Sequence, residues 1–179
     1  SSISITKISE NLLKKHRVIG MHFMNPVPIM KLVEVINGRH TSSEVTKKII
    51  DYSKSINKIP LIANDSPGFI SNRILLPMIN EAIEALDSGV SDVKSIDGIM
   101  KLGMGHPMGP LQLADLIGLD VCKSILEIMH KGLNNEKYRP NKLLIDLVNK
   151  GNLGVKSGEG FYNYSNSKKA EVISKRFLK

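Results

Sequence analysis

The hydrophobic pattern of the chain changes near Asn64, and this change constrains the fold more than any other feature. Before it, short apolar runs alternate with one helical stretch. Strands are predicted at residues 18–23, 32–36 and 59–63, with the helix between the second and the third. After it, apolar residues recur at helical spacing as far as about Asn149. An α/β segment over residues 1–64 therefore precedes an all-α segment over residues 65–179.

Local signals predict where the helices begin and end. Thr41-x-x-Glu44 predicts a capping box at the start of the helix between the strands. Pro67 is predicted in the first turn of a long helix that ends near Ser88, because proline fits that position. Further helices are predicted at residues 92–102, 110–117, 119–131, 141–149 and 168–177, with a glycine-rich loop at 151–160 and an extended piece at 161–164.

The composition is that of a globular protein without a membrane span. The chain has 179 residues, of which 41% are hydrophobic and 23% charged. No apolar run approaches the roughly 20 residues that cross a bilayer, and residues 1–4 carry no targeting pattern. The lone cysteine, Cys122, lies in an apolar helical stretch and fits a reducing compartment. We expect a cytoplasmic protein, or a mitochondrial matrix protein if the source is eukaryotic.

The formal net charge of +8 indicates either an anionic partner or a solvated surface rich in lysine. Four Tyr, four Phe and no Trp offer few rings for base stacking, and the lysines are spread along the chain. We therefore predict no nucleic-acid partner. A small molecule that bears phosphate would satisfy the charge equally well.

His22 and Glu34 each stand inside an apolar stretch of predicted strand. An unpaired buried charge is costly, so two such groups most economically satisfy each other. If the strands pair antiparallel with a register centred on Pro28, the two residues lie directly opposite, with Cβ atoms about 4.5 to 5.5 Å apart. A carboxylate that holds one imidazole nitrogen leaves the other to take a proton, as in a general-base pair. In the alternative, His22 is structural and Glu34 faces solvent.

Two side-chain amides accompany this pair. Asn25 lies in the proline-stiffened loop that follows the first strand. Asn72 lies one turn into the helix predicted to start after Pro67, where an exposed or capping role is the alternative to a place in the site. Both amides are candidate binding residues.

The segment 151–160 combines glycines with Lys156, which suits contact with a phosphate, although ordinary turns explain the glycines as well. Neither the Walker spacing nor Gly-x-Gly-x-x-Gly occurs in the chain. His106 and His130 have no Cys, Asp or Glu at metal-ligand spacing, so no metal site is predicted.

Several ordered motifs between Ser1 and about Tyr164 resemble those of the L-3-hydroxyacyl-CoA dehydrogenase family, and most of all its bacterial short-chain form. The motifs are Gly-Met-His22-Phe-Met-Asn25-Pro, Met30-Lys-Leu-Val-Glu34-Val-Ile, Asp65-x-x-Gly-Phe-Ile-x-Asn72-Arg73, Lys101-Leu-Gly-x-Gly-His-Pro-Met-Gly-Pro and Lys156-Ser-Gly-Glu-Gly-Phe-Tyr. Met24 replaces the Phe that is more usual after His-Phe, which is a tolerable exchange. Motifs in this number and order are highly specific.

The resemblance implies NAD-dependent oxidation of the 3-hydroxyl of an acyl-CoA to a ketone, or the reverse reduction, in fatty acid metabolism. It makes His22 the base and Glu34 the residue that orients it. Ser1 and Asn72 would bind the substrate oxygen, with Asn25 nearby, and Lys156 would contact the cofactor together with Ser1 and Asn25.

The same resemblance assigns residues 1–64 to the C-terminal part of a Rossmann-type NAD-binding domain. Residues 65–179 become the helical domain that closes over the acyl-CoA and forms a homodimer. The family begins with a glycine-rich dinucleotide unit, which we expect to be absent from this chain. That N-terminal half would then belong to the same protein, be supplied by a separate chain, or have been lost together with the activity. The alternative function is a non-catalytic acyl-CoA-binding or dimerisation module derived from such an enzyme.

Overall fold

A computed structural model describes residues 3–178 and divides after Ser71 into two compact units. Unit 1 extends to Ser71 and unit 2 begins at Asn72. The elements of unit 1 are α1 (Ile5–Ser9), the 3₁₀ turn η1 (Lys15–Arg17), β1 (Gly20–Phe23), β2 (Leu32–Asn37), α2 (Ser43–Ser55) and β3 (Ile59–Asn64). The three predicted strands are therefore present. The predicted order, an α/β part followed by a helical part, is confirmed.

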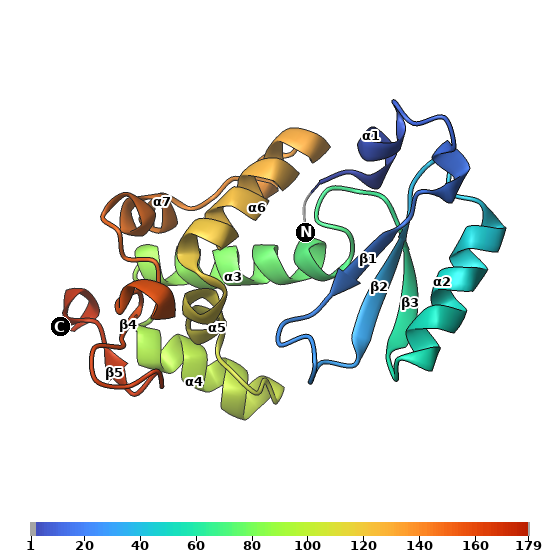
Figure 1. Cartoon of the computed structure of the whole chain (residues 1–179). Coiled ribbons are helices and arrows are strands. Elements are labelled where there is room, and N and C mark those ends of the chain that lie inside the picture. The colour runs from blue at the N-terminus through green and yellow to red at the C-terminus, as the bar shows by residue number, and fades with distance from the viewer. Residues whose placement is uncertain (1–2, 179) are drawn as a thin grey trace. The chain divides into compact units, whose positions relative to one another are not determined.

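Unit 1 is built on a three-stranded sheet in the order β1-β2-β3, and α2 covers one of its faces (Figure 1). β1 runs antiparallel to β2, whereas β3 runs parallel to it. Because side chains alternate along a strand, Val35 and Asn37 share the face on which the Thr46 hydroxyl of α2 donates to Asn37 (2.8 Å). Ile36 faces the other way and packs with Ile5 and Phe69. Glu34 shares that second face.

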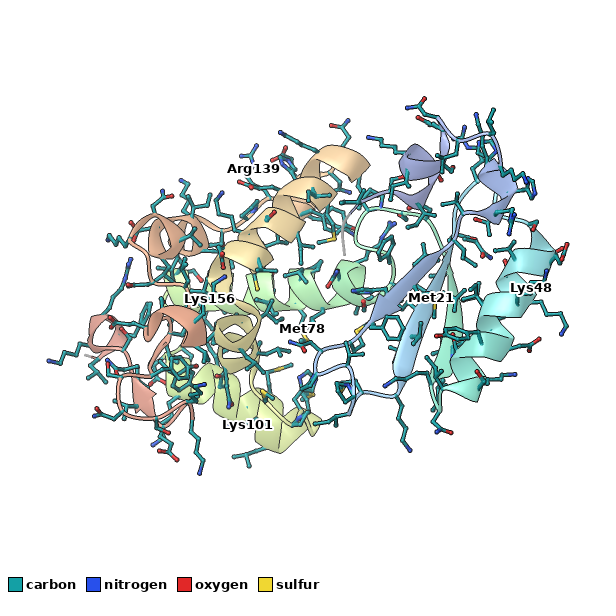
Figure 2. All side chains as sticks on the ribbon, viewed as in Figure 1. Met21, Lys48, Met78, Lys101, Arg139 and Lys156 are labelled. Atoms are coloured by element: carbon teal, nitrogen blue, oxygen red, sulfur yellow. The ribbon has the colours of Figure 1, made fainter. Side chains whose placement is uncertain are left out.

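The predicted capping box at Thr41 and Glu44 is wrong. Ser42 is the N-cap of α2, and its hydroxyl accepts a hydrogen bond from the N–H of Val45 (3.3 Å). The Thr41 hydroxyl instead donates to the Val18 carbonyl (2.6 Å), which fastens the loop before α2 to the chain before β1. Glu44 pairs along the helix with Lys48, which extends from the exposed face of α2 (Figure 2).

The long helix also begins later than its proline suggested. Gly68 (φ 82°) and Phe69 (φ 50°) adopt left-handed backbone conformations that interrupt a helix, so α3 starts at Ser71. The turn from Asp65 to Ile70 belongs to unit 1, because the Asp65 carboxylate accepts from the Ser4 hydroxyl (2.7 Å) and Phe69 packs beneath the sheet. The division between the units therefore falls after Ser71, beyond the boundary expected near Asn64.

Unit 2 consists mainly of helices (Figure 1). Their buried apolar side chains form one core. Its elements are α3 (Ser71–Asp87, of which Ser71 lies in unit 1), α4 (Val93–Met104), α5 (Pro110–Ile117), α6 (Leu119–Leu133), η2 (Glu136–Tyr138), α7 (Lys142–Asn149), η3 (Val155–Ser157), β4 (Tyr162–Asn163), β5 (Val172–Ile173) and η4 (Lys175–Phe177). Leu76, Ile79 and Ile83 of α3 are fully buried in that core, as is Cys122. None of the helices in residues 3–178 is long and apolar enough to cross a membrane.

The basic tail helix predicted at 168–177 is wrong. The segment forms the short strand β5, which pairs with β4, and then the 3₁₀ turn η4. Buried Ser174 anchors it, because its N–H donates to the Phe161 carbonyl (3.0 Å) and its hydroxyl donates to Glu159 (2.7 Å). These contacts with a distant segment outweigh the local helical pattern.

Two buried aspartates hold the C-terminal part of unit 2. Asp97 of α4 accepts from the N–H of Leu111 (2.8 Å) at the start of α5 and from the Tyr162 hydroxyl (2.7 Å). Asp115 of α5 accepts from the N–H of Tyr162 (2.9 Å) and from the Tyr164 hydroxyl (3.0 Å). The extended piece after the glycine loop is thus fixed to two helices by carboxylates.

The glycine-rich loop owes its composition to this packing. A Cβ atom at Gly154 would collide with the backbone of Asp115, and one at Gly160 would collide with the Asp115 carboxylate. Gly154 also has a positive φ of 90°. Close backbone approach and turn geometry therefore account for these two glycines.

Replacing Asp115 by Asn should destabilise the protein. The amide NH₂ would face N–H and O–H donors, and leaving a buried donor unpaired costs about 1–3 kcal/mol in the free energy of unfolding. Chemical denaturation of Asp115→Asn and of Asp87→Asn, a matched change at an exposed aspartate, measures the difference. The Asp87 variant should stay within about 0.5 kcal/mol of the parent protein.

The same two variants should also differ in how their free energy of unfolding depends on pH. Burial raises the pKa of Asp115 to about 6, although three hydrogen bonds oppose the rise. A raised native pKa adds stability that is complete below the usual aspartate pKa and is lost as the pH rises through about 6. The Asp115→Asn variant should lack this decline, and an unchanged pH dependence would contradict the argument.

Candidate active site

His22 and Glu34 meet across β1 and β2. The register pairs His22 with Glu34 directly, as the alignment about Pro28 predicted. The His22 Nδ1 atom lies 2.7 Å from Oε2 of Glu34, which confirms the predicted hydrogen bond. The contact occupies one ring nitrogen and leaves Nε2 as the nitrogen that can exchange a proton.

The Glu34 carboxylate receives three hydrogen bonds besides the contact with His22. The N–H groups of Ile70 (3.1 Å) and Ser71 (3.0 Å) donate to Oε1. The Ser71 hydroxyl donates to Oε2 (2.6 Å), the oxygen that also meets His22. Glu34 is only 4% exposed, so these donors replace the water that a carboxylate would otherwise need.

Burial alone would raise the pKa of Glu34. The hydrogen bonds from the Ser71 hydroxyl, from His22 and from the two backbone N–H groups outweigh that effect, so the pKa of Glu34 is lowered. The carboxylate therefore stays ionised at neutral pH and can stabilise a positive imidazolium beside it.

The His22 ring is placed by packing as well as by the carboxylate. Its centroid lies 5.6 Å from that of Phe69, with the planes tilted by 59°. An apolar hollow of about 220 Å³ adjoins the ring and is lined by Ile5, Met21 and Phe69 among others. The histidine thus combines a fixed Nδ1 with apolar side chains beside its ring.

The structure does not gather all the predicted site residues into one cluster. Asn25 is exposed in the loop after β1, at a cis bond to Pro26. Asn72 is the second residue of α3 and the first of unit 2. Lys156 lies in η3 of unit 2 (Figure 2), where it forms an ion pair with Asp120 (2.5 Å). Ser1 lies outside the described residues.

Sequence reasoning missed three residues that shape the pair. Ser71 donates to Glu34, and Phe69 packs against the ring. Lys58 contacts the loop that joins β1 to β2. Its Nζ atom donates to the carbonyls of Val27 (2.5 Å) and Met30 (2.8 Å). A signal for Ser71 was its place beside Asn72 in a motif, but nothing local to the sequence pairs it with Glu34.

Within residues 3–178, no group of three or more His, Cys, Asp or Glu residues is arranged to hold a metal ion. A histidine with a carboxylate on Nδ1 can take a proton from a hydroxyl at Nε2 and return it.

Comparison with known proteins shows the family to which the chain belongs. Residues 1–66 match the NAD binding domain of 3-hydroxyacyl-CoA dehydrogenase, and residues 68–164 match its C-terminal domain. The two matched domains follow each other in the same order as units 1 and 2. The chain belongs to the 3-hydroxyacyl-CoA dehydrogenase family.

Individual relatives agree with this assignment. A Deinococcus radiodurans protein named "Probable 3-hydroxybutyryl-CoA dehydrogenase" is 56% identical over 92% of this chain and 59% of its own length. The 3-hydroxybutyryl-CoA dehydrogenase of Bradyrhizobium diazoefficiens is 51% identical over 94% of this chain and 57% of its own. The crystal structure of (S)-3-hydroxybutyryl-CoA dehydrogenase from Ralstonia eutropha superposes with a TM-score of 0.91 at 48% identity, over 93% of this chain and 59% of that one. The chain spans less than three fifths of the length of these relatives.

The expectation that the NAD-binding unit is absent is wrong, because residues 1–66 match the NAD binding domain of the family. The same match contradicts the expected partner that would supply this unit to the chain. Our expectation rested on the missing glycine fingerprint, which describes a single turn. The match extends instead over the strands and helix of unit 1.

In its neutral form, His22 should carry its proton on Nδ1. The carboxylate of Glu34 accepts from that nitrogen and so selects the tautomer. Nitrogen-15 NMR shifts distinguish the two tautomers. His130 is an internal control, because its Nε2 atom is the one that meets Glu136 (2.9 Å), and it should show the opposite tautomer. A His22 that is mainly protonated on Nε2 would contradict the arrangement.

Proposed function

We propose that the protein oxidises the 3-hydroxyl of a 3-hydroxyacyl-CoA to a ketone with NAD, or carries out the reverse reduction. The observation that carries the proposal is the hydrogen bond between His22 Nδ1 and the buried Glu34 carboxylate. The family to which the chain belongs and the names of its relatives support the same reaction.

In the oxidation, His22 acts as the general base. Its Nε2 atom accepts the proton of the substrate hydroxyl while the C3–H bond breaks and the carbonyl forms. Bound NAD would supply the acceptor for the hydride that leaves C3. Glu34 offsets the charge of the imidazolium that results, as its lowered pKa favours. In the reduction, the same imidazolium returns the proton to the oxygen.

The hollow beside His22 and the loop after β1 fit this chemistry. The hollow is lined mainly by apolar side chains, against which the substrate can pack next to the ring. Asn25 offers an exposed amide two residues after β1. We assign Asn72 and Ser1 to the substrate oxygen, and Asn25, Ser1 and Lys156 to the cofactor, as the resemblance implies.

The net charge of +8 suits a substrate that carries the phosphates of coenzyme A. A cytoplasmic or mitochondrial matrix location remains our prediction. The alternative, a non-catalytic acyl-CoA-binding or dimerisation module, predicts acyl-CoA binding without turnover. Steady-state assays with NAD and 3-hydroxybutyryl-CoA separate these two functions.

Replacing His22 by Gln in the full-length protein should lower kcat by roughly 10² to 10⁴, the contribution of general-base catalysis. The glutamine keeps polar atoms at the site but cannot take up a proton. His40→Gln changes an exposed histidine in the loop before α2 and should retain the parent rate. Full activity in the His22 variant would refute the role of the base.

We also propose that the protein forms a homodimer through unit 2. An apolar groove of about 340 Å³ lies between α3 and α4, and Met78, Ala82, Ile96 and Ile99 line it. Ile99 is 60% exposed, which leaves a large apolar side chain for a second copy to cover.

Ile99→Lys should shift the protein from dimer to monomer, because a charge would be buried in the contact. Sedimentation velocity measures the change. Val172→Lys alters an equally exposed residue on β5, outside the groove, and should leave the assembly intact. A dimer that tolerates Ile99→Lys would exclude this face as the interface.

A further inference from the structure

Two hydrogen-bond donors converge on one oxygen of Glu34. The Ser71 hydroxyl lies 2.6 Å from Oε2, and Nδ1 of His22 lies 2.7 Å from the same atom. The other oxygen, Oε1, is held by the N–H groups of Ile70 and Ser71. Ser71 therefore contacts both ends of the carboxylate, once through its backbone and once through its side chain.

This hydroxyl does not perform the usual task of a serine at the start of a helix. An N-cap serine accepts a hydrogen bond from a backbone N–H two or three residues further along. Ser71 is the first residue of α3, and its hydroxyl donates to a side chain that lies 37 residues earlier in the sequence. A local capping role does not explain this hydrogen bond, which instead satisfies Oε2 of the Glu34 carboxylate.

The two donors on Oε2 differ in an important way. The His22 ring is the group that takes up and releases the proton in the proposed reaction, so its bond to Glu34 changes strength during turnover. The hydroxyl bears no charge at either stage and remains a donor throughout. It can therefore keep Oε2 in place and ionised while the histidine changes its charge.

We propose that Ser71 is a positioning residue for the His22–Glu34 pair: its hydroxyl fixes Oε2 so that the carboxylate orients the imidazole. This inference rests on the proposed function. Ser71 acts through Glu34, so its loss should affect kcat much more than KM. The Ser71 side chain is also the largest of the hydrogen-bonding influences that lower the pKa of Glu34 against its burial.

The test compares Ser71→Thr with Ser71→Val in the full-length protein. Threonine and valine have nearly the same shape, but only threonine keeps the hydroxyl. Ser71→Ala removes the hydroxyl without adding volume and covers the case in which a branched side chain does not fit. Ser55→Val, at an exposed serine of α2, serves as the control.

The valine and alanine variants should lose about tenfold in kcat, the effect of removing one hydrogen bond to a charged group, with KM little changed. The threonine variant should recover most of that loss. Carbon-13 NMR of the Glu34 carboxyl provides a readout that does not depend on turnover. Its pKa should rise in the valine and alanine variants and remain near the parent value in the threonine variant.

Equal kcat values in the three variants, or a Glu34 pKa that does not respond to the loss of the hydroxyl, would overturn the positioning role. A shifted pKa with unchanged kcat would also overturn it, because the hydrogen bond would then be structural only. Failure of the proposed function gives a different result: His22→Gln would keep its activity, whatever the Ser71 variants do to Glu34.

Discussion

The buried carboxylate of Glu34 is the group on which the arrangement of unit 1 depends. A buried charge without partners would cost several kcal/mol, and the chain avoids that cost with donors from two segments. β1 contributes His22, and the junction of the turn with α3 contributes the N–H groups of Ile70 and Ser71 and the Ser71 hydroxyl. The hydrogen bonds to the Glu34 carboxylate therefore hold three parts of unit 1 together, namely β2, the turn and the histidine.

The pair itself could be predicted from the sequence because it depends on short-range information. Two strands joined by a short loop admit few registers, and the period of two along a strand places Glu34 on the same face as Leu32 and Ile36. The resulting partnership with His22 is the one found. Ser71 and Phe69 could not be found in this way, because their positions depend on a turn with two left-handed residues that brings a distant segment back to the sheet. Such a backbone path has no periodic signature.

The errors have a common physical origin. Thr41 and the segment 168–177 both carry patterns that favour a helix cap or a helix, and in both cases a contact with a distant segment prevails. Local propensities are worth less than about 1 kcal/mol per residue, so one buried hydrogen bond is enough to reverse them. The expectation that the NAD-binding unit is absent also relied on a local pattern. It treated the lack of one glycine motif as the lack of a whole domain.

A comparison of the two units shows how environment separates a reactive carboxylate from a structural one. Asp115 accepts hydrogen bonds from two N–H groups and one hydroxyl, yet burial dominates and raises its pKa to about 6. Glu34 has similar donors and, in addition, a histidine, and its pKa is lowered. The difference decides what each can do: Asp115 holds a strand to a helix in a site that disfavours charge. Glu34 keeps its charge and can stabilise a positive charge on the His22 ring beside it.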